Sequence, residues 1–316
     1  SVAIMKVFWV PFLQKRYGSM RVDTVIEQLN KKRSIYMGLR VAIQGYEGCF
    51  HHIAAEGYFG EEIQIVPCAT FRGVVRALEE GSADAALMAI ENSIAGSILP
   101  NYGLLQDRLL RVVGELYLQI RQNLLVLPDV ELSEIREVWS HPMALLQCAD
   151  YLDDKGWRLV ETEDTALSAR QVGEQRVRHA AAIAGELPAR LFGLKVIAPE
   201  INTIKNNHTR FMVLRRSADC PVDRIVGEER INKASLYFQV GHRKGTLASV
   251  LNTMERYNIN MTKLQSYPVP SDPFHYLFHL DMEFEDVWEY REAVAHMRSV
   301  SDGLTVYGEY TRGIHI

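Results

Sequence analysis

Residues 39–59, LRVAIQGYEGCFHHIAAEGYF, decide the fold class, because an apolar run leads directly into a glycine-bearing turn and then into a helical pattern. Residues 63–67 continue as a buried strand. Thr70 has the chemistry of an N-cap for a helix that ends at Gly81, and residues 85–90 form a further apolar strand. Strands and helices that alternate at this spacing predict a mostly parallel sheet with helices on both faces.

A second series of strands and helices repeats this rhythm. We expect strands at residues 116–127, 137–139, 158–160, 180–183 and 210–214, with helices at 143–152 and 165–176. Two such series over residues 38–215 predict an α/β region of two lobes, with ligands gathering between them beyond the carboxyl ends of the strands. Residues 216–231 are charged and aperiodic and contain Pro221 and Gly227, which predicts a linker.

Residues 232–316 have a pattern of their own. Alternating apolar residues predict strands near 236–240, 259–264, 276–284 and 304–310, and helical periodicity predicts helices at 247–257 and 286–300. The order is βαββαβ, a ferredoxin-like unit, and its one open sheet face is expected to need a partner surface. At the other end of the chain, residues 1–37 are expected to form an extension with a short amphipathic helix at 22–32.

The composition narrows the class of protein. Hydrophobic residues make up 47% of the 316 residues and charged residues 23%, as in an ordinary globular protein. The 35 Lys and Arg residues against 39 Asp and Glu residues give a net charge of −4, which disfavours nucleic acid as a partner. The apolar stretch 2–13 is interrupted by Lys6 and Pro11 and is shorter than the roughly 20 residues of a membrane span, so we expect no membrane partner.

The cysteines and the absent motifs disfavour several kinds of site. The four cysteines, at positions 49, 68, 148 and 220, have no CxxC spacing, so we expect no metal site and reduced thiols in a cytoplasmic protein. The sequence contains no GxGxxG, GxxxxGK[ST], HExxH or GxSxG pattern, which removes the usual support for dinucleotide, P-loop, metalloprotease and serine-hydrolase functions.

Three polar clusters follow expected strands, where ligands of α/β proteins bind. The first is ENSIAGS at residues 91–97, whose hydroxyl, amide and backbone N–H groups can bind an anion or simply cap a helix. The second is Ser140-His141-Pro142, where His141 is either a general acid or a structural residue. The third is KNNHTRF at residues 205–211, whose guanidinium, hydroxyl and aromatic ring favour an anionic ligand over a solvated loop.

Together these clusters resemble the motifs of the bacterial prephenate dehydratase family, in which a catalytic region is followed by an ACT regulatory domain. The matching segments are GYEGCF at 45–50, IENSIAGS at 90–97, SHP at 140–142 with Gln147-Cys148, DTA at 164–166 and NHTRF at 207–211. Each motif is weak alone. Five in order over residues 39–312, followed by a βαββαβ unit, make the resemblance specific.

The resemblance implies a hydro-lyase that converts prephenate to phenylpyruvate, CO2 and water in phenylalanine biosynthesis, without metal or cofactor. It implies a two-lobed catalytic region like a periplasmic binding protein over residues 38–215 and an ACT domain over 232–316. Thr209 is implied to act on the leaving hydroxyl, and Arg210 and the N–H groups from 92 to 96 are assigned to carboxylate binding. The implied substrate-binding residues are Glu91, Asn92, Ser93, Gly96, Ser140, His141, Thr165, Asn207, Arg210 and Phe211, with His141 and Phe211 as pocket walls.

The resemblance also implies feedback regulation by L-phenylalanine, bound at a dimer interface of the ACT domain in a homodimer or homotetramer. The implied effector-binding residues are Gly245, Thr246, Leu247, Ala248, Gln265, Ser266, Tyr267 and Pro268. The sequence departs from the family pattern there, with GTLA for GALV and QSYP for ESRP. In the opening loop Tyr46, Cys49 and His51 replace a proline, a hydroxyl residue and a serine, so direct roles for them are not expected.

Two alternative functions stay open. One is arogenate dehydratase, whose substrate has an amine where prephenate has the side-chain ketone. The other is a non-catalytic amino-acid sensor, since two α/β lobes resemble a solute-binding protein. The ENS and TRF motifs disfavour the sensor, because a sensor has no need of both, and no residue decides between the two substrates.

Overall fold

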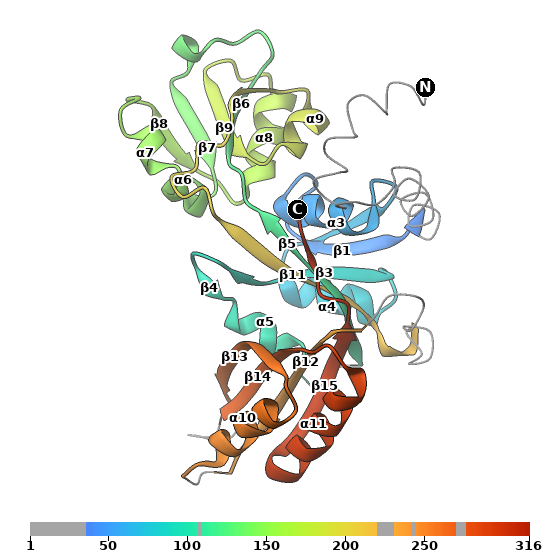
Figure 1. Cartoon of the computed structure of the whole chain (residues 1–316). Helices are drawn as coiled ribbons and strands as arrows, with labels where there is room; N and C mark the ends of the chain where they lie inside the picture. The colour runs from blue at the N-terminus through green and yellow to red at the C-terminus, as the bar shows by residue number, and fades with distance from the viewer. Residues whose placement is uncertain (1–35, 107–108, 220–230, 242–243, 270–275) are drawn as a thin grey trace, which may run out of the picture.

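The computed structural model describes residues 36–106, 109–219, 231–241, 244–269 and 276–316 (Figure 1). A first sheet lies in the middle of the view, a second sheet above it and a C-terminal unit below it. The helix expected at 22–32 and most of the expected linker, with Pro221, Gly227 and Cys220, lie outside the described residues. In the part of the chain that is described, no helix is long and apolar enough to span a bilayer.

The opening segment forms the expected strands and helices. Its elements are β1 (Arg40–Gln44), α3 (Phe50–Phe59), β2 (Gln64–Cys68), α4 (Phe71–Glu79) and β3 (Ala85–Asn92). Thr70 caps α4, since its Oγ1 accepts the Gly73 N–H at 3.1 Å. The turn after β1 depends on glycine, because Gly45 has a φ of +103°, where other L residues are strained.

The first sheet is mixed, so the expectation of a mostly parallel sheet is wrong here. β1 is parallel to β2 and β3, but β11 (His208–Arg216) lies between β3 and β5 (Leu110–Gln119) and is antiparallel to both. The reason is connectivity, because the chain leaves for the second sheet along β5 and returns along β11. The segment 91–97 does not lead directly into a helix either: β4 (Gly96–Ser97) first folds back onto β3, and α5 (Leu99–Leu104) follows.

The second sheet has the strand order β10-β6-β9-β7-β8. Its elements are β6 (Asn123–Val126), η1 (Leu132–Glu134), β7 (Glu137–Ser140), α6 (Pro142–Gln147), α7 (Ala149–Leu152), β8 (Arg158–Glu161), α8 (Thr165–Glu174), β9 (Ala180–Ala184), α9 (Leu187–Phe192) and β10 (Lys195–Ala198). The single strand expected at 116–127 is wrong, because residues 120–122 cross between the sheets. There the outgoing segment bonds to the returning one, with Ile120 N–H donating to the Asn207 carbonyl at 2.7 Å.

The C-terminal unit has the expected order βαββαβ. Its elements are β12 (Lys233–Gln239), α10 (Thr246–Arg256), β13 (Asn260–Pro268), β14 (Tyr276–Glu283), α11 (Val287–Val300) and β15 (Asp302–Tyr310), and the short β16 (Ile314–His315) then pairs with β5. The sheet is antiparallel in the order β13-β14-β12-β15. Both helices cover one of its faces, where Leu236, Val250 and Met297 are fully buried.

The other face of the C-terminal sheet packs on the first lobe. Tyr237 and Tyr307 share a core cluster with Tyr102 of α5. β15 joins β5 at the pair Gly308 and Val112, where a Cβ on Gly308 would lie only 2.6 Å from the Val112 Cβ. One eleven-stranded sheet therefore runs through both parts. The partner surface expected for this unit is the first lobe of the same chain.

His279 lies in this interface, and its burial predicts a pH dependence of stability. Its ring packs against that of Tyr102 at 4.7 Å, and the residue is 1% exposed. Burial lowers the pKa of His279 from 6.5 to about 4. Between about pH 4 and pH 6.5, His279 is protonated in the unfolded chain but neutral in the folded chain. The free energy of unfolding therefore falls as the pH drops from 6.5 toward 4, by at most about 1.4 kcal/mol per pH unit.

Urea denaturation across this pH range, for the wild type and for His279→Phe, measures the effect. Phenylalanine keeps an aromatic ring but does not titrate, so the variant is expected to lose stability less steeply on acidification. Identical pH slopes for the two proteins would show that His279 is protonated as readily in the folded chain as in the unfolded one.

Candidate functional site

Strands β3 and β11 run side by side and bring the motifs at 91–97 and 207–211 together. Thr209 pairs with Asn92, and Arg210 pairs with Glu91. Side chains alternate between the faces of a strand, and a register shift after Arg210 re-aims those of β3. As a result Asn92 and Thr209 contact each other, whereas Glu91 and Arg210 contact the C-terminal unit.

Asn92 is the centre of the candidate site. Its Oδ1 accepts the N–H groups of Ile94 and Ala95, at 3.0 and 2.9 Å, which closes the turn between β3 and β4. Its Nδ2 donates to Asn207 Oδ1 at 2.7 Å and to Thr209 Oγ1 at 3.1 Å. Asparagine favours such turns because its short side chain can replace a backbone partner. The amide is thereby fixed in orientation, and it fixes the Thr209 hydroxyl.

The Thr209 hydroxyl is oriented by Asn92. The residue is 9% exposed, and its Oγ1 accepts the Asn92 amide. Among the described residues no acceptor takes the hydroxyl proton of Thr209, so that proton is available to a ligand. A hydrogen bond received by the oxygen polarises the O–H bond and strengthens the donation.

Asn207 supplies a second donor beside Thr209. The residue is 1% exposed, and its Oδ1 is taken by Asn92. Its Nδ2 is buried and has no partner within the described part of the chain. A buried N–H without an acceptor is costly, so a ligand oxygen that receives this hydrogen bond is bound favourably.

The family model of prephenate dehydratase matches residues 41–219. The chain is also 34% identical over 293 residues to arogenate dehydratase/prephenate dehydratase 2, chloroplastic, of Arabidopsis thaliana, with 90% of this chain and 75% of the relative covered. The chain belongs to the prephenate dehydratase family.

Solved structures of similar fold include a member of this family. Prephenate dehydratase from Arthrobacter aurescens, in complex with L-Phe, superposes with a TM-score of 0.74 at 25% identity, covering 87% of this chain and 90% of that one. GqqA, described as a novel type of quorum quenching acylase, gives a TM-score of 0.76 at 27% identity, with 86% and 98% covered. A fold shared with an acylase does not by itself fix the reaction.

The role expected for Arg210 in this dehydratase is wrong. Its guanidinium is 4% exposed and points away from Thr209. Nε and Nη2 donate to Glu115 Oε2 at 2.7 and 2.6 Å, and Nη1 bonds to Asp281. Burial opposes the charge, but the carboxylates of Asp281 and Glu115 outweigh it and raise the pKa of Arg210. All three guanidinium nitrogens are therefore used within the protein, because carboxylates of the two packed parts enclose them.

The turn 91–97 also differs from the prediction. Glu91 Oε1 accepts from Lys263 at 2.5 Å, so this oxygen is engaged with the C-terminal unit. Three of the backbone N–H groups expected to bind carboxylate are engaged within the protein, because Asn92 accepts those of residues 94 and 95 and the His208 carbonyl accepts that of Ser93. Ser93 Oγ accepts the His208 N–H at 2.9 Å, and Gly96 pairs with Asn92 at a φ of +81°.

The predicted residues of the second sheet hold its local structure. Ser140 is fully buried and donates to the Ile183 carbonyl at 2.6 Å, so its expected contact with substrate is wrong. His141 caps α6 through Nδ1, which accepts the Met143 N–H at 3.2 Å. Thr165 opens α8 and is partly buried. Ser140 and His141 thus both make hydrogen bonds within the region of the second sheet.

Phe211 is a core residue rather than the wall of an open pocket. It is 1% exposed and packs edge to face on His51, with ring centroids 4.9 Å apart. Burial lowers the pKa of His51 to about 4, so the imidazole is neutral at physiological pH. His51 therefore packs against Phe211 of β11 as a neutral ring.

The predicted effector residues lie on two elements of the C-terminal unit. Gly245 is the left-handed N-cap of α10, at a φ of +86°, and the Thr246 hydroxyl donates to the Gly241 carbonyl at 2.9 Å; Leu247 and Ala248 follow in the first turn. Gln265, Ser266, Tyr267 and Pro268 lie on β13, the edge strand of the described sheet. Tyr267 packs over Gly103 of α5, where a Cβ would lie 2.8 Å from its hydroxyl.

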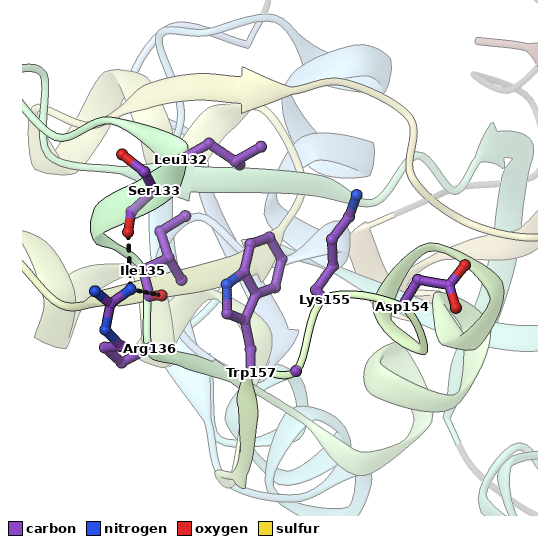
Figure 2. A pocket seen from close by; sticks show the side chains of 8 residues that line it. Leu132, Ser133, Ile135, Arg136, Asp154, Lys155 and Trp157 are labelled. Carbon is purple, nitrogen blue, oxygen red and sulfur yellow. Dashed lines mark hydrogen bonds between the residues drawn. The ribbon is translucent and has the colours of Figure 1, made fainter.

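A surface hollow of about 560 Å³ lies elsewhere, on the second sheet (Figure 2). Its lining residues include Ile135, Arg136, Lys155 and Trp157, which precede the first residues of β7 and β8. Figure 2 shows Arg136 bonded to the carbonyls of Ser133 and Ile135. Ligands of such sheets bind at the carboxyl ends of strands, so this hollow lies at the opposite end of the strands from an expected binding site.

Several buried charges were not predicted. Glu115, Lys233 and Asp281 are each 1% exposed, and Lys263 is half-buried. The available signal was a charged residue inside an otherwise apolar strand, as in LRVVGELYLQ and YLFHLDME. A buried charge is costly unless it is paired, so each of these side chains needs a partner of opposite charge. The sequence alone does not show which residue that partner is.

Asn207→Asp tests the second donor of the site. The substitution preserves shape and the acceptor for Asn92, but it replaces the free N–H with an anionic oxygen. For a substrate carboxylate at this position, we expect KM to rise about 10- to 150-fold, which corresponds to the loss of a charged hydrogen bond of about 1.5–3 kcal/mol. Steady-state kinetics measures the change. Asn206→Asp, at the exposed neighbouring position, is the matched control, and an equal rise in both variants would contradict this role for Asn207.

Proposed function

We propose that this member of the prephenate dehydratase family acts on prephenate itself, with Thr209 as the proton donor to the departing hydroxyl. The single observation that carries the proposal is the Asn92–Thr209 hydrogen bond, which orients a hydroxyl and leaves its proton available. The family model over residues 41–219 supports the reaction class, a lyase.

The bonding changes can be followed atom by atom. The bond from the ring to its carboxylate breaks and releases CO2, and the electron pair of that bond moves into the ring. The ring C–O bond breaks at the opposite carbon, and the departing oxygen takes a proton to leave as water. Aromatisation of the ring supplies the driving force, so the protein needs to bind the substrate, orient it and deliver one proton.

Each residue of the site has one task in this scheme. Thr209 donates to the leaving oxygen, either directly or as a relay, because a threonine hydroxyl is too weak an acid to release its proton alone. Asn92 orients Thr209, and Asn207 Nδ2 binds a carboxylate oxygen. Placing the reacting groups in this way contributes to catalysis by orientation rather than by strong acid chemistry.

Arogenate is the second candidate substrate. The Arabidopsis relative carries both dehydratase names, and the two substrates differ only at the side chain. Reaction on arogenate would give phenylalanine, and reaction on prephenate would give phenylpyruvate. Product analysis therefore separates the two activities.

We further propose that the βαββαβ unit is an ACT domain that binds L-phenylalanine between two copies of the chain, in a homodimer or homotetramer. Three observations support this: the element order, the left-handed Gly245 at the start of α10, and the exposed edge strand β13. A solved relative holds L-Phe. An effector that prefers the less active arrangement shifts the population by its differential affinity, typically about 1–3 kcal/mol.

The deciding experiment is an assay of the purified protein with prephenate and with arogenate, each with and without L-phenylalanine. Formation of phenylpyruvate, reduced by L-phenylalanine, is the expected result. Turnover of arogenate alone would reassign the substrate. Binding of L-phenylalanine without turnover of either compound would show a sensor and overturn the enzymatic proposal. Light scattering with and without L-phenylalanine measures the state of assembly.

A further inference from the structure

We propose that Lys263 and Asp281 of the C-terminal unit are positioning residues for the active site, acting through Glu91 and Arg210. The inference rests on the proposed function for its kinetic readout only. The side chains of Glu91 and Arg210 are bonded within the protein. In this proposal they connect the candidate site to the C-terminal unit.

Lys263 holds the hairpin that carries Asn92. Its Nζ donates to Glu91 Oε1 at 2.5 Å and to Ser97 Oγ at 2.6 Å. Glu91 and Ser97 are opposite each other in the pairing of β3 with β4. One cation from β13 therefore binds both strands of the hairpin, on either side of the turn that Asn92 closes. The side chains of Lys263 and Glu91 are 15% and 32% exposed, so the pair is only partly screened by water.

Asp281 holds the strand that carries Thr209. One of its carboxylate oxygens bonds to Arg210 Nη1, and the other accepts from Ser235 at 2.5 Å. The side chains of Asp281 and Arg210 are 2% and 4% exposed, so this ion pair is fully enclosed between the C-terminal unit and the first lobe. Separating the pair would leave buried charges without partners, which makes its geometry strongly preferred.

These contacts reach the site through single peptide links. Glu91 precedes Asn92, and Arg210 follows Thr209, in two strands that pair with each other. Neighbouring residues of a strand point to opposite faces. The C-terminal unit therefore contacts one face of the strand pair, and the side chains of Asn92 and Thr209 lie on the other. A small displacement of β13 or β14 then changes the distance between Asn92 Nδ2 and Thr209 Oγ1 without touching substrate. The same contacts offer a physical route by which a ligand of the C-terminal unit would alter activity.

Hydrogen exchange tests the proposal without any substrate. Lys263→Met removes the cation at a partly exposed position, and Glu292→Gln removes a charge from the exposed face of α11 as the control. In Lys263→Met we expect the amides of residues 94 and 95 to exchange at least about tenfold faster, since the turn that protects them is no longer held. Amides of β9 in the second sheet should not change. Unchanged exchange at residues 94 and 95 would overturn the role of Lys263.

A double-mutant cycle then distinguishes positioning from direct substrate binding. If Glu91 acts through Lys263, Glu91→Gln, Lys263→Met and the double variant should lower kcat by similar factors, because each breaks the same link. If Glu91 instead contacts substrate, its effect should appear in KM and should persist unchanged when Lys263 is absent, which would overturn the proposal. Asp281→Asn, which keeps the volume of the side chain, should likewise lower kcat more than it raises KM, and the reverse split would overturn the role of Asp281. A wild type without turnover refutes the proposed function alone, since the exchange experiment still decides the role of Lys263.

Discussion

Thr209→Ala is expected to lower kcat by about 10²- to 10⁴-fold, the usual contribution of a positioned proton donor. The substitution removes the hydroxyl that Asn92 orients at 3.1 Å, together with the γ-methyl group. Because the backbone of β11 is held by β3 and β5 on both sides, the strand should keep its register. The loss should therefore appear in kcat, with the thermal unfolding midpoint almost unchanged.

Thr209→Ser is the matched control, since serine restores a hydroxyl at the same carbon. This variant should retain most of the activity, because Asn92 can donate to the serine oxygen in the same way. A decrease of less than threefold in Thr209→Ala, measured by phenylpyruvate formation under saturating prephenate, would show that another group delivers the proton.

Glu115→Gln is expected to lower the free energy of unfolding by about 3–5 kcal/mol, the cost of breaking a buried ion pair. Glu115 is 1% exposed. Its two oxygens receive hydrogen bonds from Arg210 at 2.7 Å, from Lys233 at 2.8 Å and from the Gly313 N–H at 3.1 Å. Glutamine has the same shape but no charge, so Arg210 would keep only Asp281, and Lys233 only Glu283, as a carboxylate partner.

Urea denaturation at neutral pH measures this change. Glu174→Gln on α8 is the control, because Glu174 also accepts from an arginine, Arg170 at 2.8 Å, but is half exposed. Its loss should change stability by at most about 0.5 kcal/mol, as for exposed helix pairs. Similar effects of the two substitutions would show that burial adds nothing to the Glu115 network.

Removal of the C-terminal unit would disturb folding as well as regulation. The unit contributes Lys233, Ser235 and Asp281 to a buried network whose other members, Glu115 and Arg210, belong to the first lobe. Truncation before β12 would expose those charges and the apolar face around Tyr102. Point substitutions at Lys263 and Asp281 separate regulation from folding more cleanly.

The local elements of this protein could be read from the sequence because their causes are local. The apolar run before Gly45 predicts β1, the Thr70 hydroxyl predicts the start of α4, and the alternation at 276–284 predicts β14. The motif NHTRF likewise identified the candidate site, since it carries chemistry at a strand end. Periodicity, caps and short motifs depend on residues within one turn or one strand of each other.

The direction in which the motif side chains point was decided only by tertiary structure. The family resemblance places Arg210 and Glu91 among the substrate-binding residues, yet their partners Asp281 and Lys263 lie more than 70 residues away on another unit. The mixed sheet and the crossing at residues 120–122 depend in the same way on which strands meet. The sequence by itself determined the elements, the family motifs and the reaction class that they imply. Whether each charged side chain binds substrate or pairs within the protein was decided only by the fold. A charged side chain is buried without a large loss of stability only where the fold brings a partner of opposite charge within hydrogen-bond distance, and here these partners are distant in sequence.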